Sequence, residues 1–158
     1  IDKYSWVDVG SSYLPGEIVA AFLWAQIEEA DIITAKRMTI WNAYQQAFKE
    51  LSLAGQVRTP ILPDTSEHNA HMFYLLMRDI NEREALINSM KMSGINCVFH
   101  YVPLHNSAFS QSRLYSAPNL TITNDVSRSI LRLPLWIGLN VDEVIKQAKV
   151  FLQTRNYQ

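Results

Sequence analysis

The chain has 158 residues, of which 48% are hydrophobic and 18% charged, and its net charge is −1. This length and composition predict one compact domain with a substantial apolar core. The near-neutral charge argues against a general attraction to nucleic acid or to an anionic membrane. No charge-free apolar run approaches the roughly 18 residues that span a bilayer. The single Cys97 excludes an internal disulfide, so we expect a cytoplasmic protein in a reducing compartment.

The beginning of the chain is unusual for the start of a domain. It opens at Ile1 without an initiator methionine and enters the short aromatic segment 4–7. The termini of complete domains are more often polar and loosely held. We therefore expect that an upstream part is missing, with a processed terminus as the alternative.

A long helical stretch is predicted from Glu17 to about Leu53, as one helix or as two in line. It contains neither glycine nor proline, and Pro15 and Glu17 suit a helix start. Residues 18–27 are apolar on nearly all sides, which predicts that they are covered on more than one side by a missing domain or a second subunit. The second half is amphipathic, and Gly55 ends it.

The rest of the chain predicts a small sheet with helices packed on it, which makes the fold class α+β. The apolar run 72–77 predicts a buried strand, and 95–102 predicts a second one. Residues 82–93 between them predict a helix that ends at Gly94, so the three elements form a βαβ-like unit.

The last third of the chain is less regular. Proline in residues 132–136 predicts a short edge strand, because proline cannot donate to a ladder. A loop, a short helix with Thr123 as its N-cap and a closing amphipathic helix are expected over residues 103–120, 123–131 and 142–152.

The densest group of polar side chains is the segment 99–105, where a predicted strand enters a proline turn. Alternation along a strand puts His100 on one face and Tyr101 on the other. Imidazole and phenol both donate and accept hydrogen bonds, so this segment favours recognition of a polar ligand. The alternative to ligand recognition is that these side chains form hydrogen bonds with nearby backbone groups and have only a structural role. His68 and His71 form a second group before the first strand.

Metal binding and thiol catalysis are weakly supported. Cys97 and His100 have a possible ligand spacing, but no second cysteine follows. Three residues apart on a strand, the two side chains face opposite ways, which argues against a nucleophile–base pair. No glycine-rich phosphate loop is present. We therefore expect no metal site, and part of a pocket rather than a complete catalytic set.

Five segments of the chain, in this order, resemble the C-terminal part of the sugar aminotransferases of the DegT/DnrJ/StrS type. They are the segments 2–15, 20–26, 69–74, 99–105 and 131–135. The resemblance covers nearly the whole chain, and the ordered set is specific although each motif alone is weak.

The resemblance implies a pyridoxal-phosphate enzyme with the aspartate-aminotransferase fold of type I. In such an enzyme an amino group passes from glutamate to the cofactor and then to the keto carbon of a nucleotide-linked sugar. The family implies a homodimer and a cofactor lysine ahead of Ile1. Residues 1–16 would link to the missing large domain, and 17–158 would form the C-terminal small domain, including the interdomain helix 17–53. The chain alone is then expected to be inactive, with no catalytic residue of its own.

The resemblance also implies roles for individual residues. His100, Tyr101 and His105 match the family's stretch on the sugar side of the pocket, and His71 matches a position near it. Ser12 and Tyr13 fall in a family turn that reaches the cofactor phosphate of the neighbouring subunit. In this turn the family usually carries asparagine where Ser12 stands and arginine where Leu14 stands, so the bidentate arginine contact is lost.

Three other functions stay open. A related cofactor-dependent sugar dehydratase would carry histidine at the cofactor-lysine position. A stand-alone ligand-binding or dimerisation module would have no catalysis. A metal-dependent hydrolase would use the histidines.

Overall fold

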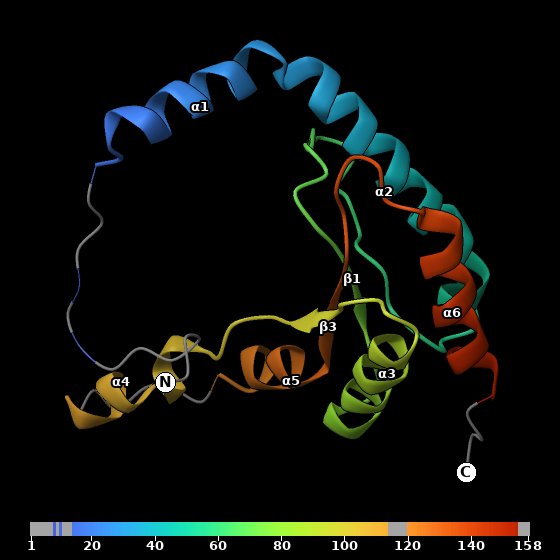
Figure 1. Ribbon diagram of the computed structural model, residues 1–158. Helices are drawn as coiled ribbons and strands as arrows, with labels where there is room; N and C mark the ends of the chain where they lie inside the picture. The colour runs from blue at the N-terminus through green and yellow to red at the C-terminus, as the bar shows by residue number, and fades with distance from the viewer. Residues whose placement is uncertain (1–7, 9, 11–13, 114–119, 155–158) are drawn as a thin grey trace.

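The computed structural model describes residues 8, 10, 14–113 and 120–154. Two consecutive helices begin it, α1 (Glu17–Glu28) and α2 (Ala30–Leu53), which meet at a turn and form one arched helical run (Figure 1). This confirms the predicted helical stretch in its two-helix form. The run ends as expected at Gly55, whose φ of 70° lets the N–H groups of residues 55 and 56 close back on the last turn.

The sheet has three strands in the order β1-β3-β2, and both outer strands are antiparallel to β3. The strands are β1 (Phe73–Leu76), β2 (Val98–Phe99) and β3 (Ile130–Leu133), and α3 (Ile80–Met92) connects the first two. The β1-α3-β2 unit is therefore a split one, because β3 is inserted between its two strands.

The prediction of an edge strand over residues 132–136 was wrong, because β3 is the central strand. Pro134 follows the last strand residue, Leu133, so its missing N–H is not needed in the ladder. Instead its carbonyl accepts a hydrogen bond of 2.8 Å from the hydroxyl of Tyr44 on α2.

Two other expected boundaries also differ. The strand expected over 95–102 contains only Val98 and Phe99, because β3 offers it two partners, Arg132 and Leu131. The region expected to be a loop contains a 3-10 turn, η1 (Leu104–Asn106), and a short helix, α4 (Ala108–Ser112).

The helix α5 (Thr121–Ser129) begins before Thr123, so the predicted N-cap was wrong. Leu120 takes that position, without a side-chain hydrogen bond to the helix. Thr123 lies within the first turn.

The core lies between the sheet and the helices α2, α3 and α6 (Val141–Thr154). Figure 1 shows α2 and α6 side by side on one side of the sheet, with α4 and α5 toward the other. Tyr44 and Phe48 of α2 place their rings 5.1 and 6.3 Å from the ring of Phe73 in β1. All three side chains are fully buried, so the second half of α2 anchors the sheet.

The helix α3 has strong signals at both ends. The Asp79 carboxylate accepts a hydrogen bond of 2.9 Å from the Glu82 N–H, and Glu82 accepts one of 2.7 Å from the Arg78 N–H. At the other end Gly94 has a φ of 75°, and the N–H groups of residues 94 and 95 bond back into the helix. None of the described helices is long and apolar enough to cross a membrane.

Candidate functional site

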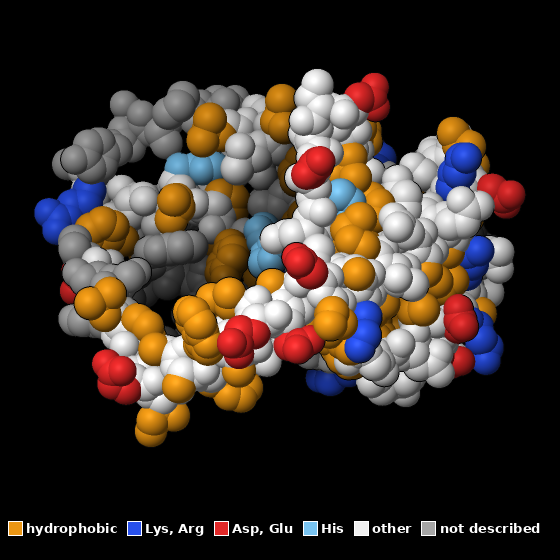
Figure 2. Space-filling model, turned by 90° about the horizontal axis from the view of Figure 1, so that it is seen from above, with side chains coloured by type: hydrophobic (Ala, Val, Ile, Leu, Met, Phe, Trp, Pro, Cys, Tyr) orange, Lys and Arg blue, Asp and Glu red, His pale blue; other side chains and the backbone are white. Residues whose placement is uncertain are grey.

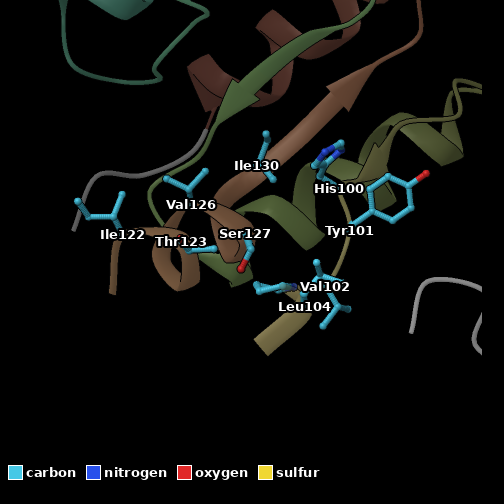
Figure 3. Close-up of a pocket in the computed structure, with 10 residues that line it drawn as sticks. His100, Tyr101, Val102, Leu104, Ile122, Thr123, Val126, Ser127 and Ile130 are labelled. Atoms are coloured by element: carbon cyan, nitrogen blue, oxygen red, sulfur yellow. The ribbon is translucent and has the colours of Figure 1, made fainter. Parts of the chain in front are cut away.

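A cavity of about 390 Å³ lies where the chain leaves β2 and runs into η1. Figure 3 shows the segment 100–104 on one side, with side chains of α5 and Ile130 of β3 on the other. The wall is predominantly apolar, with a few polar groups. It consists of His100, Tyr101, Val102, Pro103, Leu104, Ile122, Thr123, Val126, Ser127 and Ile130.

His100 and Tyr101 both line this cavity, which corrects the prediction that alternation separates them. The regular strand ends at Phe99, so the period-two pattern does not extend to them. Their rings meet edge to face with centroids 5.1 Å apart. Tyr101 is 51% exposed and His100 is half-buried, so both can meet a ligand that enters the cavity.

The environment of His100 favours the neutral imidazole. Partial burial lowers its pKa below the ordinary 6.5, and the positive charges of Arg132 and His71 lower it further. The Nδ1 atom of His100 is buried and has no hydrogen-bond partner among the described residues. A neutral ring can donate from one nitrogen and accept at the other, which suits recognition of a polar group.

His105 lies outside the cavity wall and is held by another residue. Its Nε2 atom lies 3.0 Å from the Oδ1 atom of Asn124 on α5. That oxygen also accepts a hydrogen bond of 2.7 Å from the side chain of Asn106. In this structure His105 therefore joins η1 to α5.

His71 lies just before β1 with an exposed side chain. It does not line the cavity, but its charge acts on His100. The structure thus brings His100 and Tyr101 together, places His71 in their electrostatic surroundings, and ties His105 to a neighbouring helix.

Two arginines near this group were missed in the sequence, where an isolated arginine carries no motif. Arg37 on α2 donates hydrogen bonds of 2.8 Å to the carbonyls of Ala70 and His71, and one of 3.2 Å to that of Leu135. It therefore fixes the segments that precede β1 and follow β3. Ala70 has a φ of 50°, a left-handed conformation that this clamp helps to hold.

The other arginine is Arg132 in the central strand. It pairs across the sheet with Tyr74 on one side and Val98 on the other. The strand register places it opposite Val98, two residues before His100, and no local pattern in the sequence predicts this pairing.

The described residues do not form a site for pyridoxal phosphate itself. Their lysines, 36, 49, 91, 146 and 149, lie on the helices, and none lines the cavity. The predicted phosphate contacts Ser12 and Tyr13 lie outside the described residues. The lysine and phosphate cradle of such a cofactor would have to come from elsewhere.

Cys97 is placed as a core residue rather than as a nucleophile. Its thiol is free and 3% exposed, and burial raises its pKa to about 12. It packs in the hydrophobic core, whereas His100 lines the cavity. In the part of the chain that the structure describes, no three His, Cys, Asp or Glu side chains form a possible metal site.

The sequence and the fold were both compared with those of known proteins. A sequence model of the DegT/DnrJ/EryC1/StrS aminotransferase family matches residues 2–150. The solved structure of the aminotransferase TlmJ from Streptoalloteichus hindustanus aligns with a TM-score of 0.76 and 22% identity, covering 89% of this chain and 37% of that chain.

Two further structures align over nearly the whole chain. PseC from Helicobacter pylori, an aminotransferase in pseudoaminic acid biosynthesis, has a TM-score of 0.76 and 21% identity over 94% of this chain and 40% of that one. DesV from S. venezuelae, solved with a ketimine intermediate, has a TM-score of 0.78 and 21% identity over 98% and 41%. The chain thus has the α+β fold of one part of these proteins and spans about two fifths of their length.

Proposed function

The chain belongs to the DegT/DnrJ/EryC1/StrS aminotransferase family, and from this premise we propose that it is the C-terminal part of a pyridoxal-phosphate-dependent sugar aminotransferase. The observation that carries the proposal is the family match over residues 2–150. In this proposal residues 17–158 are the small domain, including the interdomain run 17–53. Residues 1–16 lead to a large domain that contributes the cofactor lysine, so the chain alone is inactive.

The substrate proposed is a dTDP-4-keto-6-deoxyhexose, and the amino donor is glutamate. The ordered segments from residues 2–15 to 131–135 resemble the dTDP-4-keto-6-deoxyglucose transaminase. That enzyme makes dTDP-4-amino-4,6-dideoxygalactose for enterobacterial common antigen. The proposal therefore places this chain in the biosynthesis of cell-surface polysaccharides, a class that includes lipopolysaccharide. Pyridoxal phosphate supplies the electron sink for the amino transfer when it is bound.

The described residues would serve this reaction by binding and orienting the sugar. His100 presents a neutral imidazole and Tyr101 an accessible phenol, both at one cavity. The apolar wall opposite them, on α5, would exclude water and pack against the less polar face of the deoxysugar. We also assign His105 and His71 to the sugar side of the pocket, and Ser12 and Tyr13 to the cofactor phosphate of a partner subunit.

The proposal accounts for the apolar surface of α1. None of its residues is buried, and Phe22, Leu23 and Trp24 are 72%, 51% and 65% exposed. Figure 2 shows hydrophobic side chains along α1, which extends from the rest of the molecule as an exposed arm. Such a surface fits cover by the large domain or by the second subunit of a homodimer. A cytoplasmic location is consistent with the free thiol of Cys97.

The visible absorption spectrum of the protein expressed from its complete reading frame, before and after borohydride, tests the proposal. A lysine-bound cofactor gives an aldimine band that reduction removes. Absence of that band in the presence of added pyridoxal phosphate would contradict the aminotransferase. It would favour a dehydratase with histidine at the lysine position, or a module without catalysis.

A further inference from the structure

Arg132 has an unusual position for an arginine, in the middle of the central strand. Its neighbours Leu131 and Leu133 are buried against the core, so alternation turns Arg132 toward the opposite face of the sheet. On that face it stands between Tyr74 of β1 and Val98 of β2, its partners in the two ladders. The side chain is half-buried, so the sheet holds a guanidinium that is partly removed from water.

The hydrogen-bonding capacity of this guanidinium is unused within the described part of the chain. Its Nε atom is buried without a partner. The ion pairs found among the described residues join other side chains, namely Arg78 to Asp79, Arg83 to Glu84 and Lys146 to Glu143. A buried donor without a partner is unfavourable, and the more so when it is charged. Such a group is expected to have an oxygen partner when the protein works.

His100 supplies a second nitrogen without a hydrogen-bond partner among the described residues. Val98 pairs with Arg132 and Phe99 with Leu131, so His100 follows β2 two residues after the partner of Arg132. The charge of Arg132 contributes to the lowered pKa of His100, which places the two side chains within electrostatic reach. The Nδ1 atom of His100 is also buried and unpaired among the described residues. Two buried nitrogens without a described partner thus come from neighbouring segments, the central strand and the residue that follows β2.

The permanent charge near these nitrogens is the guanidinium of Arg132. His71 also acts on His100, and it reaches this place from the segment that Arg37 clamps before β1. One basic side chain before β1 and one within β3 therefore lie within electrostatic reach of His100. A convergence of nitrogen donors with positive charge is complementary to an oxyanion.

We propose that Arg132 and His100 form an oxyanion-binding site that holds a carboxylate or phosphoryl group of a substrate. The proposal deepens the function proposed above and rests on it for the identity of the ligand. The carboxylates of the amino donor and the phosphates of the nucleotide are the two sources of such a group. His100 also lines the apolar cavity, so the group attached to the oxyanion would lie along that wall.

Isothermal titration of the complete protein with two separate probes, 2-oxoglutarate and inorganic diphosphate, tests the site without requiring turnover. We expect the wild-type protein to bind at least one probe. Arg132→Gln is expected to weaken that probe by about tenfold or more, the range of a charge-assisted pair. The probe that loses affinity identifies the source of the oxyanion.

The matched control is Arg128→Gln, because Arg128 is an exposed arginine on α5 that does not line the cavity. It should leave the affinity unchanged. Arg132→Lys keeps the charge and should fall between the wild-type protein and Arg132→Gln. If Arg132→Gln does not fold, His100→Gln replaces it in the same titration, with a smaller loss expected.

Two results overturn the site: neither probe binds the wild-type protein, or both bind Arg132→Gln or its replacement with wild-type affinity. These results are independent of the borohydride spectrum. An aldimine band together with affinity that does not depend on Arg132 would contradict the site and leave the aminotransferase standing. Binding that depends on Arg132, found together with the absence of an aldimine band, would support the oxyanion site and contradict the aminotransferase.

Discussion

Helix α1 and the second half of α2 are consecutive parts of one helical run, yet they meet opposite surroundings. In α1 the large side chains Phe22 and Trp24 are 72% and 65% exposed, whereas Tyr44 and Phe48 in α2 are fully buried. Both segments carry large aromatic and aliphatic side chains, so the presence of such side chains does not by itself decide which are buried. The difference lies in what this chain offers as a partner: the sheet and α6 cover α2, and no described segment buries α1.

The contrast indicates which part of the molecule is self-contained. The buried half of α2 closes a core with the sheet, α3 and α6, while α1 presents a surface suited to another body. Figure 2 shows the exposed arm beside a hollow in which histidine side chains are visible. If the proposed function is right, the rest of the enzyme would cover the exposed surface of α1 and close the hollow beside it.

The largest expected effect comes from removing an aromatic ring on each side of this contrast. Phe48→Ala leaves a cavity where a fully buried ring packs against Tyr44 and Phe73. It should destabilise the chain by about 3–5 kcal/mol. Phe22→Ala in the same chain should change stability by less than about 0.5 kcal/mol. Urea unfolding of both variants checks the difference, and equal losses would contradict the contrast.

The next effect concerns the clamp between α2 and the sheet. Arg37→Met removes three hydrogen bonds to backbone carbonyls that precede β1 and follow β3. We expect a loss of about 1–3 kcal/mol, because the carbonyls lose their donor. The control is Arg58→Met, since the side chain of Arg58 is exposed. Similar midpoints for the two variants in urea unfolding would show that the clamp is dispensable.

A smaller effect is expected at the end of α3. Gly94 has a φ of 75°, and no atom lies within 4 Å of the place that an alanine methyl group would take, so Gly94→Ala is strained by backbone conformation rather than by contact. It should cost about 1 kcal/mol, because a residue with a Cβ atom is strained in the left-handed conformation. Gly16→Ala, before the exposed α1, is the control, because Gly16 has a φ of −68° and equally open space. Thermal denaturation should separate the two, and a neutral Gly94→Ala would contradict the left-handed cap.

The smallest effect is the pH dependence that His100 contributes. Its lowered pKa means that the unfolded chain binds a proton at this site more readily than the folded one. The stability contribution is therefore fully present above pH 6.5 and is lost as the pH falls from there toward the folded-state pKa. His100→Asn should flatten the fall in urea midpoint between about pH 7.5 and about pH 5.5. An unchanged slope would show that His100 does not titrate as described.

The sequence predicted the α2 anchor, β1, α3 and α6 because each has a clear period or end signal, such as Asp79 and Gly94 around α3. It misplaced β3 because an edge position was inferred from Pro134, which in fact lies beyond the ladder. The pairing of strands distant in sequence is a tertiary property that local patterns do not encode.

The candidate site shows the same division. His100 and Tyr101 stood out as a polar pair at a strand end, and the structure places both at the cavity. Arg132 and Arg37 were missed, because one acts through strand register and the other through backbone carbonyls far away in sequence. Their significance comes from neighbours that only folding brings together.

Amide hydrogen exchange, followed by mass spectrometry on the chain alone and on the complete protein, tests the contrast between α1 and α2 most directly. We expect residues 17–28 to exchange rapidly in the chain alone and to become protected in the complete protein. The buried half of α2 around Phe48 should be protected in both, because the chain supplies its cover. Equally rapid exchange of residues 17–28 in both samples would contradict the claim that α1 is an interface for the rest of the enzyme.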